Sequence, residues 1–466
     1  MLLGVVLVQA AWVLAVPPFR GMDEFDHAFR AAGVASGQWR LDEEAAGHRG
    51  LLVDLPADFV AASEGQCRSL PYIESDTCDG DGPGPDGTVR ATTSAANYVP
   101  IYYWVVGTAA EPFSGAHALY AMRAASALLC ALVIAVAVGC LTTWVRGPWA
   151  YVGMLVGLTP TLLYTTTVVA PNGLEMAAGL CLWTSLLGLG TGEPDLRRER
   201  QLLTAAALGV VLLAGLRSLG PVLVVLVLVC VVALRGFRPL LEVVGRHRLL
   251  VGTTVVLAVA TTAGVFLWNQ GNVAFEHGAL NDDVDPSWTQ ALRWPTWILS
   301  SIGAFPYRDQ PAPLAVHALV LLVMVALLVL AVRRGDGTER RAVVLAAVMC
   351  LAVPSVLVAL TLQERGGVWQ GRYLLPFMVG VVVLAGLVLD RARWRGPTLV
   401  AVGMLAVAQV ISVVHVQLTE LDRDVSAQDP GWSHPPTAVT GLLVLLGCAV
   451  LAAVLPLLRR TEVTVP

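Results

Sequence analysis

The sequence predicts an all-α, polytopic integral membrane protein with about twelve transmembrane helices. Of its 466 residues, 56% are hydrophobic and only 14% are charged, and the mean hydropathy is +0.69. A soluble protein of this length needs a larger polar surface than that charge content supplies. Apolar runs of roughly 17–25 residues, the length that crosses a bilayer, recur along the whole chain.

The apolar runs define twelve predicted spans. They cover residues 1–18, 119–144, 149–169, 173–191, 201–217, 219–236, 249–268, 314–332, 341–362, 373–390, 398–416 and 438–458. The first run is short, but it has no basic residue before Arg20, whereas a signal peptide normally begins with positive charge. We therefore predict a single transmembrane domain over residues 1–466, with long extracytoplasmic loops at 19–114, 269–313 and 417–437.

The arginines, which make up all 30 basic residues, agree with this assignment. If the N-terminus is cytoplasmic, the inner connections carry 17 arginines against 8 acids, and the loop 19–114 carries 15 acids against 6 arginines. A wrong number of spans would scramble this alternation, because cytoplasmic loops favour positive residues. We expect both termini in the cytoplasm and the chain in the plasma membrane. The arginines form no basic face, so the lipid bilayer is an expected partner and nucleic acid is not.

The first outer loop contains two ordered segments. Between Asp23 and Ser36, apolar residues recur at a helical spacing, which predicts a helix at the membrane surface. Residues 98–106 are rich in aromatic side chains and predict a second interfacial segment. Between them, residues 79–88 are rich in Gly, Pro and Asp and predict a flexible stretch.

Cysteine positions suggest one disulfide. Six of the eight cysteines lie inside apolar runs, where cysteine acts as a small buried hydrophobe. Cys67 and Cys78 are both in the first outer loop, where an oxidising environment lets disulfides persist, so we predict that they pair. The alternative is two free thiols. Neither has a partner at the spacing of a zinc site.

Ionisable side chains gather where the predicted spans meet the outer membrane surface. They are Asp23, Glu24, Asp26 and His27 after the first span, Arg123 near the start of the second, Glu175 early in the fourth, Arg217 after the fifth, and Gln370-Gly371-Arg372-Tyr373 at the start of the tenth. Such groups are costly to hold at a membrane boundary, so they predict a functional site. A carboxylate can accept a proton from an acceptor hydroxyl, and arginines bind phosphate bidentately.

Each group also has an interpretation without chemistry. The acidic stretch can be a solvated loop, and the three arginines can extend to lipid headgroups. Glu175 can satisfy free backbone amides at a helix start. His27 can orient the neighbouring acids by a hydrogen bond. Asp23 can cap a helix, since Asp is a preferred N-cap residue.

These motifs resemble those of the GT-C glycosyltransferases, membrane enzymes that take sugar from a polyprenyl-phosphate donor. The pattern Asp23-Glu24-x-x-His27 is similar to the Asp-Glu motif of the protein O-mannosyltransferase branch. Residues 97–104 (Asn-Tyr-Val-Pro-Ile-Tyr-Tyr-Trp) resemble the juxtamembrane element of aminoarabinose-transferase relatives.

The resemblance is closer to the domain of unknown function 2142, a family of bacterial membrane proteins, and runs through most of the chain. It rests on Pro17-Pro18-Phe19 with Asp23, Glu24, His27 and Arg30, followed by residues 370–376 (Gln-Gly-Arg-Tyr-Leu-Leu-Pro). The chain departs from the family at Met22, where proline is commoner. This departure puts little of the chemistry in doubt.

The resemblance implies a membrane glycosyltransferase with a GT-C-like fold. Asp23 would be the catalytic base, and Glu24 would help to bind the acceptor or a divalent cation such as Mg²⁺ or Mn²⁺. The expected partners are a polyprenyl-phosphate sugar donor and a glycan or other acceptor of the cell envelope, with inversion at the anomeric carbon. Implied substrate-binding residues are His27, Arg30, Tyr102, Tyr103, Arg123, Arg217, Gln370, Arg372 and Tyr373.

Two other functions remain open from the sequence. Twelve spans with both termini inside also describe a transporter, or a flippase of lipid-linked envelope precursors. Such carriers typically have two repeated halves and charges near the midplane, but residues 1–236 and 249–466 show no correspondence and the charges lie at one face. A non-catalytic scaffold for envelope assembly would be indicated if Asp23 and Glu24 were dispensable.

Overall fold

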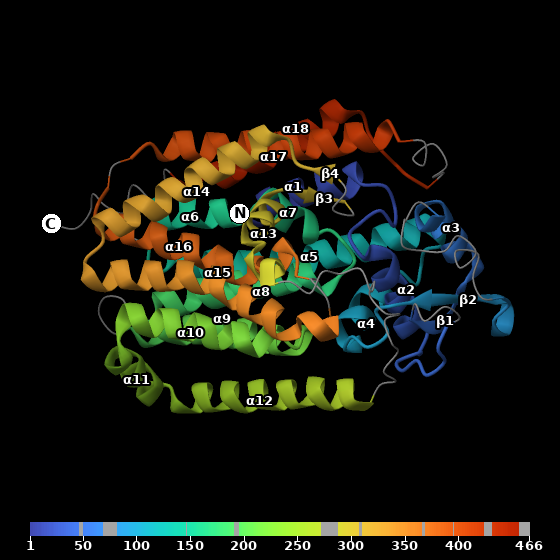
Figure 1. Cartoon of the computed structure of the whole chain (residues 1–466), viewed down its shortest axis with the longest axis horizontal. Coiled ribbons are helices and arrows are strands. Elements are labelled where there is room, and N and C mark those ends of the chain that lie inside the picture. Colours follow the sequence, from blue (N-terminus) through green and yellow to red (C-terminus); the bar gives the residue numbers. More distant parts are fainter. Residues whose placement is uncertain are drawn as a thin grey trace.

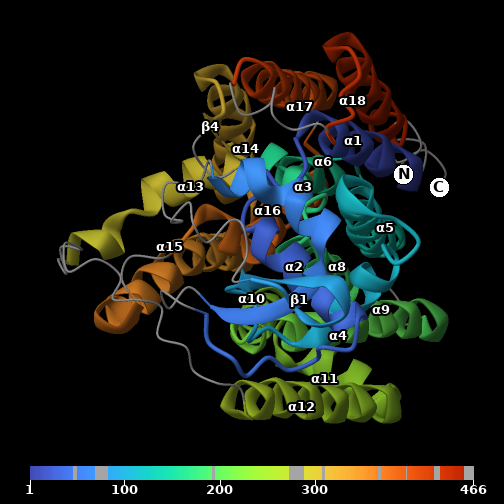
Figure 2. The ribbon, with the colours of Figure 1, turned by 90° about the vertical axis from the view of Figure 1, so that its right-hand side faces the viewer.

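The computed structural model consists of long helices side by side, with a small α/β unit at one end (Figures 1 and 2). It describes residues 1–45, 50–68, 82–145, 147–190, 195–271, 288–306, 310–365, 369–394, 396–423 and 431–455. The main helices are α1 (Leu2–Ala15), α5 (Gly115–Thr142), α8 (Pro171–Gly188), α9 (Leu196–Leu216), α10 (Gly220–Arg235), α12 (Arg248–Gly271), α14 (Leu314–Arg334), α15 (Gly337–Arg365), α16 (Leu375–Arg391), α17 (Thr398–Leu421) and α18 (Thr437–Ala452).

The predicted number of spans is not confirmed. Among the described residues, six helices (α5, α9, α12, α14, α15 and α17) are long and apolar enough to cross a membrane. A seventh span results if α10 is joined to α11 (Phe237–Arg246), although the two helices meet at 111°. Helices do occupy the other predicted spans, but they are shorter or broken.

The third predicted span is broken into α6 (Trp149–Gly157) and α7 (Pro160–Thr165). Pro160 explains the break, because the residue before a proline is disfavoured in the helical conformation. Thr159 begins α7 as its N-cap, and its hydroxyl accepts a hydrogen bond from the Leu162 amide at 3.1 Å. The carbonyl of Leu158 accepts a hydrogen bond from Gln409 Nε2 at 2.9 Å.

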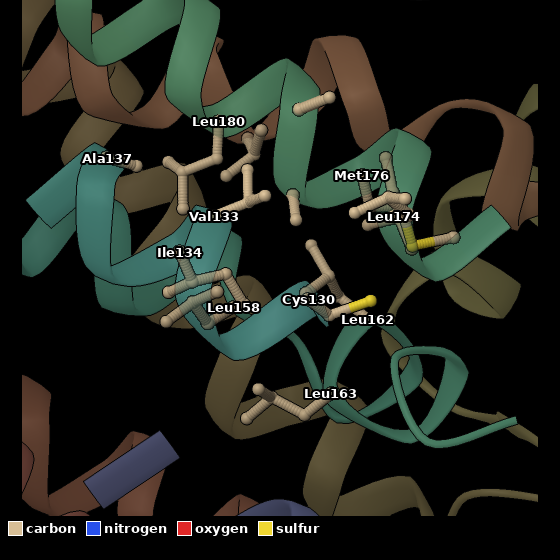
Figure 3. Packing of buried hydrophobic residues seen from close by; sticks show 14 of the residues in the cluster. Cys130, Val133, Ile134, Ala137, Leu158, Leu162, Leu163, Leu174, Met176 and Leu180 are labelled. Carbon is tan, nitrogen blue, oxygen red and sulfur yellow. The ribbon is translucent and has the colours of Figure 1, made fainter. Parts of the chain in front are cut away.

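Helices α8 and α16 form the centre of the bundle, and every described residue of α8 is buried. Helix α16 lies so close to α6 that a Cβ on Gly386 would come within 2.2 Å of the Trp149 carbonyl oxygen. Small residues permit such close approach between membrane helices. Apolar side chains of α5, α7 and α8 pack against one another (Figure 3). Helix α12, by contrast, lies at the edge of the bundle and among the described residues buries only Val265 (Figure 1).

The two ends of the bundle differ in character. The Tyr151 hydroxyl contacts Met1 Sδ at 2.9 Å and the Leu451 carbonyl at 2.8 Å, so the start of α1 and the end of α18 lie together. At this end Arg391 pairs with Glu339 at 2.9 Å. The α/β unit of the first loop lies at the opposite end (Figure 1). The arginine-rich connections and the acidic first loop are therefore separated by the length of the bundle.

The first loop folds into α2 (Glu24–Ala35), β1 (Leu51–Pro56), α3 (Ala57–Arg68), η3 (Pro85–Gly87), β2 (Thr88–Thr93) and α4 (Pro100–Thr108). Helices α2 and α4 occupy the two segments that were predicted to be interfacial, and their position at the membrane surface stays a prediction. The antiparallel pairing of β1 with β2, in which Leu51 lies opposite Thr93, corrects the all-α prediction. Of the predicted flexible stretch, residues 79–81 lie outside the described residues, and η3 occupies part of the remainder.

Five further short elements follow later in the chain. They are η4 (Trp288–Leu292) with α13 (Trp294–Ile302), the strand pair β3 (Ala304–Phe305) and β4 (Gln310–Pro311), and η5 (Gly371–Tyr373) immediately before α16. Residues of α13, β3, β4, η5 and the turn between α1 and α2 line one cavity.

Candidate active site

Asp23 lies at the end of the turn that joins α1 to α2. Its backbone is left-handed, with φ +56°, a conformation that Asp tolerates better than most residues. Asp23 occupies the N-cap position of α2, yet its side chain makes no capping hydrogen bond to that helix. Its carboxylate instead pairs with Arg372 Nη2 of η5. Asp23 thus brings the first loop against the segment that precedes α16.

Glu24, the next residue, points to a different part of the bundle. Its fully buried carboxylate accepts hydrogen bonds from Arg123 Nε at 2.7 Å and Nη2 at 2.5 Å. The amides of Gly21 and Val169 donate to the same carboxylate at 3.0 and 3.2 Å. Arg123 also donates to the carbonyls of Val16 and Pro17, both at 2.7 Å. Glu24 and Arg123 therefore fasten the turn to α5 and leave no open edge on the carboxylate.

Arg372 and Arg217 converge on the ring of Tyr373. The guanidinium carbon of Arg217 lies 4.6 Å from the ring centroid and that of Arg372 lies 5.1 Å away. Arg372 Nη2 also donates to the Tyr373 hydroxyl at 3.2 Å. Arg217 lies 3.9 Å from Glu175 and donates to the Tyr98 hydroxyl at 3.2 Å. Two arginines and two acids thus share one cluster around two tyrosines.

His27 lies beside this cluster, on the buried side of α2. Its Nδ1 shares a hydrogen bond of 2.7 Å with the Tyr103 hydroxyl, and the two rings stack with centroids 5.8 Å apart. Burial lowers the pKa of His27 to about 3, although the nearby Asp23 charge opposes this effect. The imidazole is therefore neutral at physiological pH and forms part of the site's wall.

A cavity of about 390 Å³ opens next to Arg372. Its lining includes Met22 of the α1–α2 turn, Trp297 of α13, and Trp369, Gln370 and Arg372. Among the described residues, three buried polar atoms of this wall have no hydrogen-bond partner: the donors Arg372 Nε and Trp369 Nε1, and the acceptor Gln370 Oε1. Buried polar groups are rarely left unpaired, so this wall is suited to bind a polar group from a ligand.

Gly371 allows this wall to form. A Cβ at Gly371 would lie 2.3 Å from both the Trp297 carbonyl oxygen and the Ser300 hydroxyl. Only glycine lets the segment approach α13 so closely. The glycine of the Gln-Gly-Arg-Tyr motif thus seats Gln370 and Arg372 at the cavity.

A second, much smaller space of about 20 Å³ is mostly apolar. Its lining includes Trp369 and Tyr373, Leu223 of α10, and Met349 and Pro354 of α15. Trp369 is among the lining residues of both spaces.

Residues 6–381 match the family described as predicted membrane protein (DUF2142). The chain belongs to this family. The resemblance read from the two motifs is thereby confirmed, and no curated protein matches the sequence. Membership establishes a membrane protein of the DUF2142 family.

Two solved structures of ArnT from Cupriavidus metallidurans resemble the DUF2142 chain at a distance. The structure described as bound to undecaprenyl phosphate is 17% identical, with a TM-score of 0.46, and the match covers 99% of this chain and 77% of that one. The apo structure is 16% identical, with a TM-score of 0.47, and the match covers 99% and 76%. Neither likeness is close enough to assign a role to a residue.

Two residues predicted to bind substrate, Arg30 and Tyr102, make internal hydrogen bonds, and their role in binding stays a prediction. The buried guanidinium of Arg30 donates to the carbonyls of Gln38 at 3.1 Å and Trp39 at 2.7 Å, so it fixes the chain that leaves α2. The Tyr102 hydroxyl lies 2.9 Å from Ser126 Oγ and joins α4 to α5. Both residues brace the first loop against the bundle.

Asp23 and Glu24 do not fit the divalent cation expected from the resemblance. Both oxygens of Glu24 accept hydrogen bonds, and Asp23 is paired with an arginine. Among the described residues, no group of three or more His, Cys, Asp or Glu side chains could hold a metal ion.

Cys67 is disulfide-bonded, and the six cysteines of the apolar runs are free. Cys78 lies outside the described residues, so its pairing with Cys67 stays a prediction.

The sequence did not reveal a second ion pair that secures the same turn. Arg20 Nε donates to both oxygens of Glu420, at 3.1 and 3.3 Å, and Gln310 of β4 donates to the same carboxylate. All three side chains are buried. Arg20, a charge directly after the first span, indicated that a partner was needed. That this partner is Glu420, near the end of α17, could not be predicted from the sequence.

Proposed function

We propose that this protein is a GT-C-type glycosyltransferase that moves a sugar from a polyprenyl-phosphate donor to an acceptor of the cell envelope. One observation carries the proposal. The Asp23 carboxylate, whose side chain is 35% exposed, pairs with an arginine that lines a cavity. Two hydrogen-bond donors of this cavity wall have no partner within the part of the chain that the structure describes. A proton acceptor and an anion-binding wall are therefore joined through one residue.

The cavity wall favours a phosphate. Arg372 Nε and Trp369 Nε1 are both donors, and a guanidinium binds phosphate oxygens with a planar, bidentate geometry. Arg217 adds a second positive charge, with its guanidinium carbon 4.6 Å from the Tyr373 ring centroid. The small apolar pocket beside Trp369 and Tyr373 would contact the first isoprene unit of the donor.

The reaction requires one proton acceptor. The acceptor hydroxyl oxygen attacks the anomeric carbon while Asp23 takes the hydroxyl proton. The new carbon–oxygen bond forms as the bond to the phosphate oxygen breaks, and the bonding electrons leave with the polyprenyl phosphate. That leaving group is a stable anion, so no strong general acid is needed. Attack from the face opposite the phosphate inverts the anomeric carbon. General-base catalysis of this kind typically contributes about 10²–10⁴ in rate.

The neighbouring residues would hold Asp23 and Arg372 in position. Glu24 and Arg123 fix the turn that bears Asp23, and the neutral His27 and Tyr103 form a wall beside it. In this proposal Glu24 is a positioning residue and not a metal ligand, which revises the role that the resemblance implied.

The site would face the extracytoplasmic side of the plasma membrane, with both termini in the cytoplasm. The support is the arginine asymmetry, because the acidic loop and the arginine-rich connections lie at opposite ends of the bundle. Cysteines introduced at the exposed positions Glu111 and Thr338 provide the test. An impermeant maleimide should label the first in intact cells and the second only after lysis. The reverse result would contradict the orientation.

Transfer by the purified full chain tests the activity. Polyprenyl-phosphate-linked sugars serve as donors, and envelope material from a deletion strain serves as the acceptor. Asp23→Asn should reduce transfer at least a hundredfold, because the amide cannot accept the proton. Asp42→Asn removes an equal charge from an exposed position of the same loop and should retain transfer. Near-normal transfer by Asp23→Asn would refute the role of base. Translocation of the lipid-linked donor without transfer would indicate the carrier function.

A further inference from the structure

Two arginines bind the adjacent acids of the turn in different ways. Arg123 uses both atoms of one edge, Nε and Nη2, to hold the two oxygens of Glu24. Arg372 offers Asp23 its Nη2, and among the described residues the neighbouring Nε has no hydrogen-bond partner. The edge of Arg123 is therefore filled, and the edge of Arg372 is half-filled.

The half-filled edge belongs to a buried group that lines the cavity. The Arg372 side chain is only 3% exposed, so water does not readily compensate its unpaired donor. A phosphate that binds a guanidinium edge with two oxygens occupies both Nε and Nη2. Since Asp23 already holds Nη2, a phosphate bound in this way must take the place of the carboxylate.

The turn is built so that the side chain of Asp23 can move while its backbone stays. On one side, buried Arg20 is paired with Glu420 at 3.1 Å. On the other, buried Glu24 is paired with Arg123 at 2.5 Å. Between these anchors the Asp23 side chain is 35% exposed and makes no capping bond to α2. Rotation of this side chain therefore requires no rearrangement of the two ion pairs.

We propose that the donor phosphate displaces Asp23 from Arg372, so that the base is released only when the donor is bound. The inference rests on the proposed function and adds an order of events to it. While it is paired with Arg372, the carboxylate is a poor proton acceptor, since a neighbouring positive charge favours its ionised form. Once the phosphate neutralises that arginine, the released carboxylate becomes a better base beside the bound sugar. The acceptor hydroxyl is then activated only in the presence of a donor.

If the carboxylate and the phosphate compete for Arg372, loss of the carboxylate should raise the affinity for phosphate. A purely structural Asp23 would not produce this increase. Removal of the Asp23 charge should strengthen phosphate binding, although it abolishes transfer. The probe is farnesyl phosphate, a short polyprenyl monophosphate, with farnesol and inorganic phosphate as reference ligands. Binding is measured on the purified full chain in nanodiscs.

Asp23→Asn and Asp23→Ala should each bind farnesyl phosphate about five- to tenfold more tightly than the unsubstituted protein. Asp23→Glu keeps the competing charge and should bind with nearly unchanged affinity. Asp42→Asn, at an exposed position, controls for the change in net charge. Farnesol should bind all forms equally, which would assign the effect to the phosphate. Tighter binding of inorganic phosphate by Asp23→Asn would assign it to the free anion as well.

Unchanged or weaker binding of farnesyl phosphate by Asp23→Asn and Asp23→Ala would overturn the displacement and leave the proposed transferase intact. Failure of the unsubstituted protein to bind farnesyl phosphate would overturn both. Use of two variants means that poor folding of one still leaves a measurement, and a monodisperse elution profile identifies the folded forms.

Discussion

Replacement of Glu24 by glutamine places an amide where a buried carboxylate now accepts four hydrogen bonds. One carboxylate oxygen receives Arg123 Nε at 2.7 Å and the Val169 amide at 3.2 Å. The other receives Arg123 Nη2 at 2.5 Å and the Gly21 amide at 3.0 Å. In either orientation, the glutamine NH₂ group would face two N–H donors.

The variant therefore loses two hydrogen bonds and leaves a buried arginine without a counter-charge. Removal of one partner from a buried ion pair typically costs about 3–5 kcal/mol. We expect the free energy of unfolding of Glu24→Gln to fall by about that amount. Titration of the purified protein with SDS in micelles, followed by tryptophan fluorescence, measures it.

Glu43→Gln is the matched control. Glu43 pairs with Arg90 at 2.9 Å in the same loop, but the two side chains are 56% and 36% exposed. Exposed pairs typically contribute about 0–1 kcal/mol, so this variant should remain close to the unsubstituted protein. If Glu24→Gln unfolds like the unsubstituted protein but fails to transfer sugar, Glu24 takes part in the chemistry and the positioning role is wrong.

Three further predictions concern stability. Cys67→Ser and Cys78→Ser should each lower the free energy of unfolding by about 3 kcal/mol, and the double variant should lose no more. Quantitative labelling of both thiols without reductant would exclude a Cys67–Cys78 disulfide. Because the pKa of His27 lies at about 3 and its ordinary value is 6.5, the unfolded chain binds a proton that the folded chain does not between these values. Stability should thus be unaffected by His27 above about pH 6.5 and decrease as the pH falls below it, by up to about 1.4 kcal/mol per pH unit, and His27→Gln should remove this part of the slope. Gly386→Val should destabilise the protein by about 1–3 kcal/mol through its clash with α6, whereas Gly403→Val, where no described atom lies within 4 Å of the added Cβ, should cost less; equal unfolding curves would contradict the close packing.

Local sequence patterns predicted elements well where their cause was local. The periodicity after Asp23 predicted α2 within about two residues, and the aromatic segment 98–106 overlaps α4. The break at Pro160 also had a local signal, but the apolar run around it favoured one continuous span. The strands β1 and β2 were missed because α3 and η3 lie between them, so no tight hairpin turn marks the pair.

The site, too, was only partly predictable from the sequence. Residue types at the membrane boundary identified Asp23, Glu24 and Arg372 as a group, since such charges need partners. Which acid meets which arginine could not be predicted, because the left-handed backbone at Asp23 directs two adjacent carboxylates to different parts of the bundle. The cavity was also beyond the sequence, because α13 and the Gln-Gly-Arg-Tyr segment meet only through the packing allowed by Gly371.

Helix α12 shows how differently selection should act on two membrane helices of one chain. Only 6% of its most apolar stretch is buried, so in a bilayer its side chains would face lipid on almost every side. Lipid tails accept any apolar shape, and substitutions among Val, Leu, Ile and Ala along α12 should therefore be nearly interchangeable. In α8 every side chain meets protein, and each change of volume is resisted by a close-packed neighbour. Across homologues, α12 should drift in identity while it conserves hydropathy, and α8 should conserve identity itself.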